Sequence, residues 1–437
     1  MTLPEEFEAR QRLLLGQDMP AYLACLEQAP TKGLQLNTLK VEKQAFLQSF
    51  PLPVRPNPLD EDCFLLDGEG AGKHLFHRLG LYYMQEPSAA CAVAVLDPKP
   101  GERVLDLCAA PGGKSARIAA KLGGRGLLVA NEAVTSRCGI LRSNLERLGV
   151  RNAVVLNAYP ERLKGRFEGF FDRILVDAPC SGEGMFRKEP DALTCWSPAN
   201  VEACAQRQLG ILETAVPMLR EGGLLVYSTC TFSPNENEEV CEAFVARCPH
   251  MEQVHICVPW GEAGLDGLSR RLYPHRHVGE GHFVAAFRKK GEASRQESRP
   301  GRRVSCPELE RAWAETFTVP PFGDVSVQGE RVSLLPADLP DLKGLPVLSA
   351  GVPAGESRKG RFEFAHGLFA ALEREDVQRV LQAEEAQLAA FFRGEELKTD
   401  LPDGYAAVCA GPYVAGFGKV SGGRLKNKYP KGLRSIQ

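Results

Sequence analysis

Two cysteines, Cys180 and Cys230, each follow an apolar run of the sequence. The run 174–176 leads through Asp177 to Cys180, and the run 224–227 leads to Cys230. Apolar runs that end in small or polar residues are typical of buried parallel strands. In open α/β sheets, ligands bind at the carboxyl ends of such strands. We therefore expect both thiols at one sheet edge, where one could act as a nucleophile and the other could assist it.

A second segment, 104–115, has the pattern of a cofactor loop, with a strand, small residues and the start of a helix. Gly112 and Gly113 let the backbone approach a ligand closely, and the helix start that follows favours an anion. Cys108 stands where a phosphate-binding P-loop needs glycine, which argues against an ATPase. Glu132 follows the next strand and suits ribose hydroxyls. These residues predict a nucleoside-containing cofactor without separating a dinucleotide from S-adenosylmethionine.

Alternating strand and helix patterns connect these sites and must place them on one sheet. The expected strands are 103–107, 126–130, 153–156, 171–176, 224–228 and 283–287. The expected helices between them are 115–122, 136–148 and 201–219. This alternation predicts an α/β fold with a parallel, doubly wound, Rossmann-like sheet.

The chain has 437 residues, more than one hydrophobic core supports, so we expect several domains. The predicted parts are a small α+β domain over 1–75, the sheet domain over 76–290, a basic linker over 291–305 and a C-terminal region over 306–437. Within the C-terminal region, 309–317 and 373–392 have helical patterns.

Composition limits the class of protein. With 44% hydrophobic residues and a net charge of −2, the chain is typical of soluble globular proteins, and any polyanion site must be a local basic patch. The 14 cysteines are dispersed without a Cys-x-x-Cys pair, which predicts free thiols in a reducing cytoplasm and no metal site. No signal region or membrane-spanning run is present, so we expect a cytoplasmic protein with no membrane partner.

The end of the chain is strongly basic, because no acidic residue follows Asp403. The basic residues in this tail are Lys419, Arg424, Lys426, Lys428, Lys431 and Arg434. Tyr413, Phe417 and Tyr429 lie among them. Basic groups interleaved with aromatic rings suit phosphate neutralisation and base stacking, so we expect RNA contact here, with a merely solvated face as the alternative.

Three segments, 106–114, 177–182 and 228–231, together resemble the motifs of the Sun-type (Nol/Nop/Sun) RNA cytosine-C5 methyltransferases. Further similarity lies in segments 85–88, 271–277 and 281–285. The tail resembles that of the bacterial small-subunit ribosomal RNA methyltransferase F group. The resemblance covers nearly the whole chain, and it implies a methyltransferase sheet, a ferredoxin-like N-terminal RNA-binding domain and a C-terminal PUA-like RNA-binding module.

The resemblance also implies roles for individual residues. The reaction would transfer a methyl group from S-adenosylmethionine to carbon 5 of cytosine in RNA. Cys230 would be the nucleophile, Cys180 would be needed for product release, and Asp177 would touch cofactor and base. The implied cofactor-binding residues are Cys108, Ala109, Ala110, Pro111, Gly112, Gly113, Lys114, Glu132, Arg137, Asn157 and Asp177. Asn157 stands where the family usually has Asp beside the adenine, and it keeps an acceptor but loses the charge.

The chemistry explains why such residues are needed. Carbon 5 of cytosine is a poor nucleophile, and addition of the Cys230 thiolate to carbon 6 makes an enamine that accepts a methyl group. A protonated Asp177 could supply a proton at ring nitrogen 3, and Lys114 could hold the ring carbonyl. The carbon 5 proton must then leave and the sulfur bond must break, with Cys180 as helper. The base has to be unstacked, which favours a loop or single-stranded RNA.

Several alternatives stay open at this point. The expected substrate is 16S rRNA, free or in the 30S subunit, modified by a monomer, and tRNA is the second choice. A non-catalytic ribosome-assembly RNA-binding factor would keep only a vestigial pocket. DNA cytosine methylation would place the nucleophile in the Pro-Cys motif at Cys180. His275, His277 and His282 are expected to be structural or RNA-facing.

Overall fold

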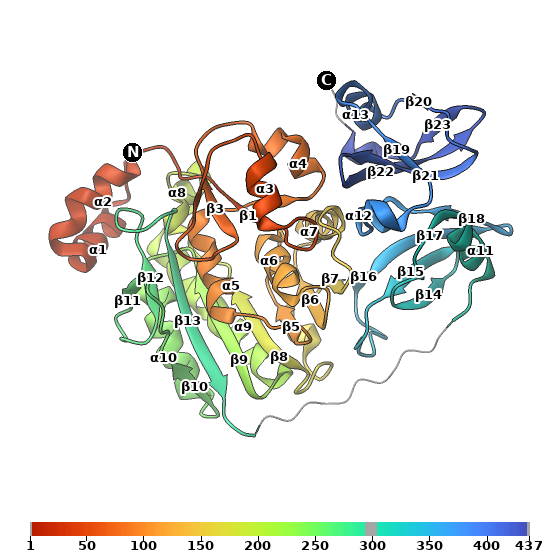
Figure 1. The fold of residues 1–437 in the computed structure, drawn as a ribbon. Coiled ribbons are helices and arrows are strands. Elements are labelled where there is room, and N and C mark those ends of the chain that lie inside the picture. The colour runs from red at the N-terminus through yellow and green to blue at the C-terminus, as the bar shows by residue number, and fades with distance from the viewer. Residues whose placement is uncertain (1, 293–303, 435–437) are drawn as a thin grey trace.

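A computed structural model describes residues 2–292 and 304–434. The described part contains a large central sheet, an antiparallel sheet built by the N-terminal part and two further sheets built by the C-terminal part (Figure 1). The linker predicted over 291–305 falls largely on residues 293–303, which lie outside the described residues.

The N-terminal part forms helices around a four-stranded antiparallel sheet. Its helices are α1 (Glu5–Leu15), α2 (Met19–Leu26), α3 (Lys43–Ser49) and α4 (Leu75–Arg78). Its strands are β1 (Gly33–Leu36), β2 (Val54–Pro56), β3 (Cys63–Leu66) and β4 (Tyr82–Met84), in the order β2-β3-β1-β4. Strand β4 lies beyond residue 75, so this sheet extends past the boundary that the sequence suggests.

The central part alternates strands and helices. Its strands are β5 (Arg103–Asp106), β6 (Leu127–Asn131), β7 (Ala153–Leu156), β8 (Phe171–Asp177), β9 (Leu219–Thr229), β10 (Met251–Val254), β11 (Glu262–Ala263), β12 (Arg270–Leu272) and β13 (His282–Lys289). Its helices are α5 (Ala90–Leu96), α6 (Gly113–Leu122), α7 (Thr135–Arg147), α8 (Pro190–Cys195), α9 (Pro198–Ala215) and α10 (Glu238–Arg247). Strands β9, β8, β5, β6 and β7 are neighbours in that order and run parallel, and β13 joins β9 antiparallel.

Helices cover both faces of this sheet, which confirms the predicted Rossmann-like α/β class. Successive residues of a strand point to opposite faces. Ile174 of β8 accordingly packs with the face that α9 and α10 cover, through Leu212 and Phe244. Leu175 packs with the face that α5, α6 and α7 cover, through Val93 among others. Burial on both sides explains why β8 reads as a continuous apolar run.

The C-terminal part builds two sheets and extends the central one. Its helices are α11 (Pro307–Thr316), α12 (His366–Ala370) and α13 (Glu385–Arg393). Its strands are β14 (Asp324–Gln328), β15 (Arg331–Leu335), β16 (Val347–Ala350), β17 (Val352–Arg358), β18 (Arg361–Phe364), β19 (Val380–Gln382), β20 (Leu397–Lys398), β21 (Gly404–Ala410), β22 (Tyr413–Ser421) and β23 (Arg424–Asn427). Strand β16 pairs antiparallel with β7, so the C-terminal part covers one edge of the central sheet.

The helix predicted over 373–392 is wrong in its first half. Strand β19 occupies part of this range and pairs in parallel with β21, with Val380 opposite Ala407. Helix α13 begins only after Glu384, whose side chain forms a capping box with Gln387. Pairing with a strand distant in sequence and a strong helix start both override the local helical pattern.

Candidate active site

Strands β8 and β9 end side by side, with Asp177 opposite Ser228 in the parallel register. The loops that follow carry the two cysteines, and the Sγ atoms of Cys180 and Cys230 lie 3.3 Å apart. Contact with Cys230, together with burial, raises the pKa of the Cys180 thiol well above its ordinary value. Cys180 therefore keeps its proton near neutral pH and is suited to donate it rather than to attack.

Buried polar side chains join the two loops. Glu236 accepts hydrogen bonds from the Ser181 backbone N at 2.9 Å, from the Ser181 hydroxyl and from Gln208 Nε2 at 2.9 Å. Ser181 Oγ also lies 2.9 Å from Thr231 Oγ1. Because Ser181 and Thr231 directly follow the two cysteines, these contacts fix the position of one loop relative to the other.

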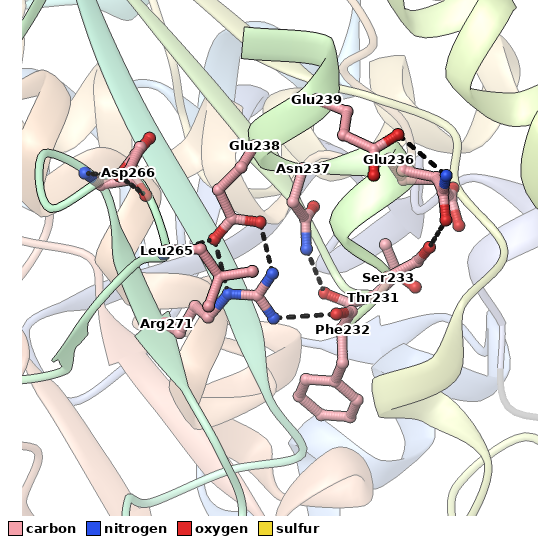
Figure 2. A network of polar contacts seen from close by, with 12 residues as sticks. Thr231, Phe232, Ser233, Glu236, Asn237, Glu238, Glu239, Leu265, Asp266 and Arg271 are labelled. Carbon is pink, nitrogen blue, oxygen red and sulfur yellow. Dashed lines mark hydrogen bonds and ion pairs between the residues drawn. The ribbon is translucent and has the colours of Figure 1, made fainter. Parts of the chain in front are cut away.

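The segment after the second cysteine is anchored by a buried ion pair (Figure 2). Arg271 of β12 donates to both carboxylate oxygens of Glu238 and, through Nη1, to Phe232 O at 2.8 Å. Asn237 Nδ2 donates to Thr231 O at 3.0 Å. Bidentate pairs of this kind constrain geometry as well as charge, so the backbone next to Cys230 is held from two sides.

Asp177, the last residue of β8, has partners on both carboxylate oxygens. Lys114 Nζ donates to Oδ2 and Ser228 Oγ donates to Oδ1, each at 2.7 Å. His282 Nε2 lies 3.8 Å from Oδ1. Burial alone would raise the pKa of Asp177, but the charges of Lys114 and His282 hold it well below its usual range. Asp177 is therefore a carboxylate in the free protein, and the protonated form considered from the sequence is not its resting state.

The loop that the sequence predicts to bind a cofactor connects β5 to α6. Gly112 has a φ of 113°, a conformation that disfavours a side chain. Ser115 Oγ donates to Asp106 Oδ2 at 2.6 Å, whereas Asp106 Oδ1 is buried and has no hydrogen-bond partner among the described residues. Burial raises the pKa of Asp106 to about 7. Gln35 of β1 donates to Gly113 O at 2.6 Å, so the N-terminal sheet supports this loop.

Glu132 and Arg137 lie on the far side of the same loop. Glu132 is almost fully buried and accepts hydrogen bonds from Val134 N at 2.8 Å and Ala110 N at 3.3 Å. Arg137 Nη2 donates to Ala110 O at 2.7 Å, and its Nη1 lies 3.9 Å from Glu132 Oε2. The structure thus brings together the predicted cofactor loop, Glu132 and Arg137.

Asn157 follows β7 and is held in place by its amide group. Its Nδ2 donates to Glu132 O at 2.8 Å and to Ala133 O at 3.1 Å, and its Oδ1 accepts from Thr135 Oγ1 at 2.8 Å. Its backbone N donates to Pro346 O at 3.0 Å, in the segment that leads into β16. Asn157 therefore links the C-terminal part to the backbone beside Glu132.

The sequence model described as 16S rRNA methyltransferase RsmB/F matches residues 93–288. Models described as the N-terminal domain, the first C-terminal domain and the PUA domain of RsmF match residues 3–87, 312–372 and 378–435. The ribosomal RNA small subunit methyltransferase F of Vibrio vulnificus is 30% identical over 99% of this chain and 97% of its own length. The chain belongs to the 16S rRNA methyltransferase RsmB/F family. The resemblance to a bacterial small-subunit rRNA methyltransferase is thereby confirmed, and the chain is an RNA methyltransferase.

Another relative of this RsmB/F-family chain, from Photobacterium profundum, has the same name and is 31% identical over 99% of the chain and 97% of its own length. Among solved structures, a methyltransferase homolog protein from Pyrococcus horikoshii is similar to it with a TM-score of 0.59 and 30% identity. That match covers 65% of this chain and 95% of the other. This structural match supports the methyltransferase fold, and the sequence model over residues 378–435 supports the C-terminal PUA domain.

Three of the six predicted RNA-binding residues of this RsmB/F-family protein, Lys419, Arg424 and Lys426, lie on a different sheet from the cysteines. In the PUA part, Lys419 of β22 stands opposite Lys426 of β23, and Arg424 of β23 stands opposite Lys398 of β20. These four exposed cations form one basic face, and Lys419 also lies over the Tyr405 ring. Sequence reasoning missed Lys398, because only the strand pairing places it beside the tail.

Two aromatic residues of the tail do not serve as exposed stacking platforms. Phe417 is buried and stacks on Phe369 of α12 with ring centroids 4.2 Å apart. Tyr429 is also buried and packs against Phe391 and Phe392 of α13. Their apolar contacts stabilise the PUA fold, and the base-stacking role considered from the sequence does not fit their burial.

Sequence reasoning also missed residues around the cysteines of this RsmB/F-family chain. Glu236 carried no visible signal, although it lies six positions after Cys230 in the same motif-bearing loop. His282 was expected to be structural or RNA-facing, yet it lies beside Asp177.

In the described ranges, no group of three or more His, Cys, Asp or Glu side chains could hold a metal ion. No helix there is long and apolar enough to cross a membrane.

Proposed function

We propose that this chain transfers a methyl group from S-adenosylmethionine to carbon 5 of cytosine in small-subunit rRNA. The observation that carries this proposal is the placement of two sulfurs, 3.3 Å apart, beside the Asp177–Lys114 pair at adjoining strand ends. Few reactions need two thiols and a carboxylate at one sheet edge. Addition of one sulfur to carbon 6 of cytosine, followed by release of the methylated product, uses all three groups. Relatives named for small-subunit ribosomal RNA support the substrate.

The charges around the cofactor loop fit S-adenosylmethionine. Asp106, Glu132 and Asp177 lie close enough for the last two to raise the pKa of the first. Lys114 pairs with Asp177, and Arg137 lies 3.9 Å from Glu132, so three carboxylates face two cations here. When bound, S-adenosylmethionine supplies a methyl group on a positively charged sulfur, and an acidic site favours that charge.

Cys230 provides the attacking sulfur in this proposal. Its thiolate adds to carbon 6 of the flipped-out cytosine, so that carbon 5 becomes nucleophilic and accepts the methyl group. Thr231 and Phe232, held by Asn237 and Arg271, keep the backbone beside this sulfur in place. Such pre-organisation lowers the cost of reaching the reactive geometry.

Cys180 acts after methyl transfer. The carbon 5 proton must be removed as the bond between Cys230 and carbon 6 breaks, which restores the aromatic ring and frees the Cys230 sulfur. Cys180 lies within contact of the Cys230 sulfur and is protonated at rest. It therefore returns a proton to the leaving Cys230 sulfur, and the thiolate that remains accepts the carbon 5 proton, so that Cys180 ends in its starting form.

Methylation of purified small-subunit rRNA from cells that lack this protein tests the proposal, with bisulfite mapping of the product. We expect 5-methylcytosine with the wild-type chain and none with Cys230→Ala. The Cys257→Ala variant is the matched control, because Cys257 is an exposed thiol outside the site. Full activity of Cys230→Ala would refute the proposed mechanism.

The same assay separates the alternatives. Preferential methylation of tRNA would identify the second-choice substrate, and methylation of DNA would argue against an RNA enzyme. Calorimetry with S-adenosylmethionine gives an independent readout, because an assembly factor with a vestigial pocket should release no heat. Measurable binding together with methylation of small-subunit rRNA alone is the result that we expect.

A further inference from the structure

Glu86 and Ser88 belong to a motif that the family resemblance singles out without a role, and they pack against the loop that enters β13. Glu86 Oε1 accepts from Glu280 N at 2.8 Å, and Ser88 Oγ accepts from Gly281 N at 3.3 Å. Gly279 has a φ of 100°, and a Cβ there would lie 2.2 Å from Glu86 Oε1 and 2.5 Å from Ser88 N. These two segments, distant in sequence, therefore form one close-packed buried unit.

His282 lies between this unit and the active site, and only 4% of its side chain is exposed. On one side, Nδ1 lies 3.1 Å from Gly281 O and 3.4 Å from Ser88 Oγ. On the other side, Nε2 lies 3.8 Å from Asp177 Oδ1 and has no hydrogen-bond partner among the described residues. The imidazole thus connects a previously unassigned motif to the carboxylate of the active site.

Both ring nitrogens of His282 face acceptors. The Ser88 hydroxyl donates to Glu86 Oε2 at 2.6 Å, so it offers Nδ1 a lone pair rather than a proton. A neutral ring would direct a lone pair either at Gly281 O or at the Asp177 carboxylate, and both arrangements are unfavourable. A ring with a proton on each nitrogen turns an N–H group toward each of these acceptors.

We propose that His282 is a positioning residue that acts through Asp177 and lends the proton that activates the target base. This inference rests on the proposed cytosine chemistry. As the Cys230 sulfur bonds to carbon 6, a proton passes from His282 Nε2 to Asp177, and Asp177 passes a proton to ring nitrogen 3. When the sulfur leaves, nitrogen 3 gives its proton back by the same route, so no net proton is consumed there.

Asp177 needs a neighbouring proton donor if it is to protonate ring nitrogen 3. Asp177 is a carboxylate at rest and cannot by itself donate to nitrogen 3, and its second oxygen is bonded to Lys114. An imidazolium next to the first oxygen supplies the missing proton without moving Lys114.

Other charged and titratable groups surround the ring. The carboxylates that face it are Asp177 of β8 and Glu86 before α5. Lys114 of α6 lies behind Asp177, and the thiol of Cys91 in α5 interacts with Lys114, Glu86 and Asp177, with its pKa raised by burial. Glu280, two positions before the ring, is paired with Arg187.

Two variants separate proton transfer from a structural role. In His282→Gln, an amide can still donate to Asp177 but cannot transfer a proton, and His282→Phe removes both abilities. The matched control is His275→Gln, because His275 packs against Tyr22 and Tyr273 instead. The measurement is the single-turnover rate of methyl transfer to unmodified small-subunit rRNA, from about pH 6 to about pH 9.

For the wild type and His275→Gln, we expect the same single-turnover rate and the same pH profile. In His282→Gln, the pH profile should change shape and the rate near neutral pH should be roughly 100-fold lower, with unchanged thermal stability. A wild-type pH profile and rate in His282→Gln would overturn the relay. That result would do so even if His282→Phe were slow, because the Gln amide cannot transfer a proton. Failure of the wild type to form 5-methylcytosine at any pH would instead refute the proposed function, and the relay with it.

Discussion

The Sγ atoms of Cys180 and Cys230 lie 3.3 Å apart, although fifty positions separate the two residues in the sequence. Their environments are unequal, because contact with Cys230 raises the pKa of Cys180 and keeps it protonated. Two equivalent thiols would suit a redox pair. One protonated thiol beside a second sulfur suits a sequence of attack by one residue and release by the other.

Replacing Cys180 with Ala should leave the attack intact and block release. We expect a covalent complex between protein and RNA to accumulate, visible as a slower band in a denaturing gel, with multiple turnover reduced by at least about 100-fold. The double variant Cys180→Ala, Cys230→Ala should form no complex. Absence of the complex from a folded, cofactor-binding Cys180→Ala variant would contradict the release role.

Oxidation should inactivate the enzyme through the same pair. A disulfide needs the sulfurs about 2.05 Å apart, so a small movement of either loop would close the gap of 3.3 Å. We expect hydrogen peroxide to abolish methyl transfer and a reducing thiol to restore it, with a Cys180–Cys230 disulfide detected by peptide mass. The Cys257→Ala variant should behave like the wild type. Full activity of protein in which this disulfide has been demonstrated would contradict the prediction.

Glu236 should matter for the geometry of the pair more than for the fold as a whole. Glu236→Ala removes the acceptor of the Ser181 backbone N and the Gln208 amide, which should cost about 1–3 kcal/mol of stability. Glu236→Gln keeps an acceptor for these donors and can itself donate to the Ser181 hydroxyl. We therefore expect Glu236→Gln to retain most of the wild-type methyl-transfer rate and Glu236→Ala to retain little. Calorimetric melting of the same variants measures their stability. Equal rates for both variants would show that the contact does not position the cysteines.

Local sequence patterns were sufficient to predict the parallel strands and the loop carrying Gly112, because apolar runs and glycines are local signals. The same patterns place Cys180 and Cys230 at one edge, since parallel strands end together. They could not reveal Glu236 or His282, because the partners of these residues lie far away in sequence and only the packed fold brings them close.

The C-terminal part was harder to predict for the same physical reason. Val380 belongs to a strand because its partner Ala407 is available in the folded chain, which a local helical pattern cannot indicate. Likewise, Phe417 reads as a candidate stacking residue until Phe369 covers it. Exposure is a property of the fold, so Phe417 and Tyr429 add no aromatic surface to the basic tail.

Asn157→Asp tests whether the amide has a structural task beside the cofactor loop. The carboxylate would meet Glu132 O and Ala133 O, which need a donor, and the loss should destabilise the protein by about 1–3 kcal/mol. We expect a lower melting temperature and a raised KM for S-adenosylmethionine, with KM for RNA unchanged. Asn157→Gln, which keeps the amide but lengthens the side chain, is the companion variant. A tighter cofactor complex in Asn157→Asp would show instead that the charge favours binding there.

The basic face should contribute to RNA affinity through salt-dependent contacts. Neutralising Lys419, Arg424 and Lys426 with Gln removes three exposed cations on adjoining strands. Each phosphate contact adds about 0.7–0.9 to the slope of log affinity against log salt, so the slope should become shallower by about 2–3. Filter binding of small-subunit rRNA at several salt concentrations measures this slope. The control is Lys290→Gln, because Lys290 follows the far end of β13, opposite the active-site edge. An unchanged slope in the triple variant would show that this face is merely solvated, and the alternative weighed from the sequence would then hold.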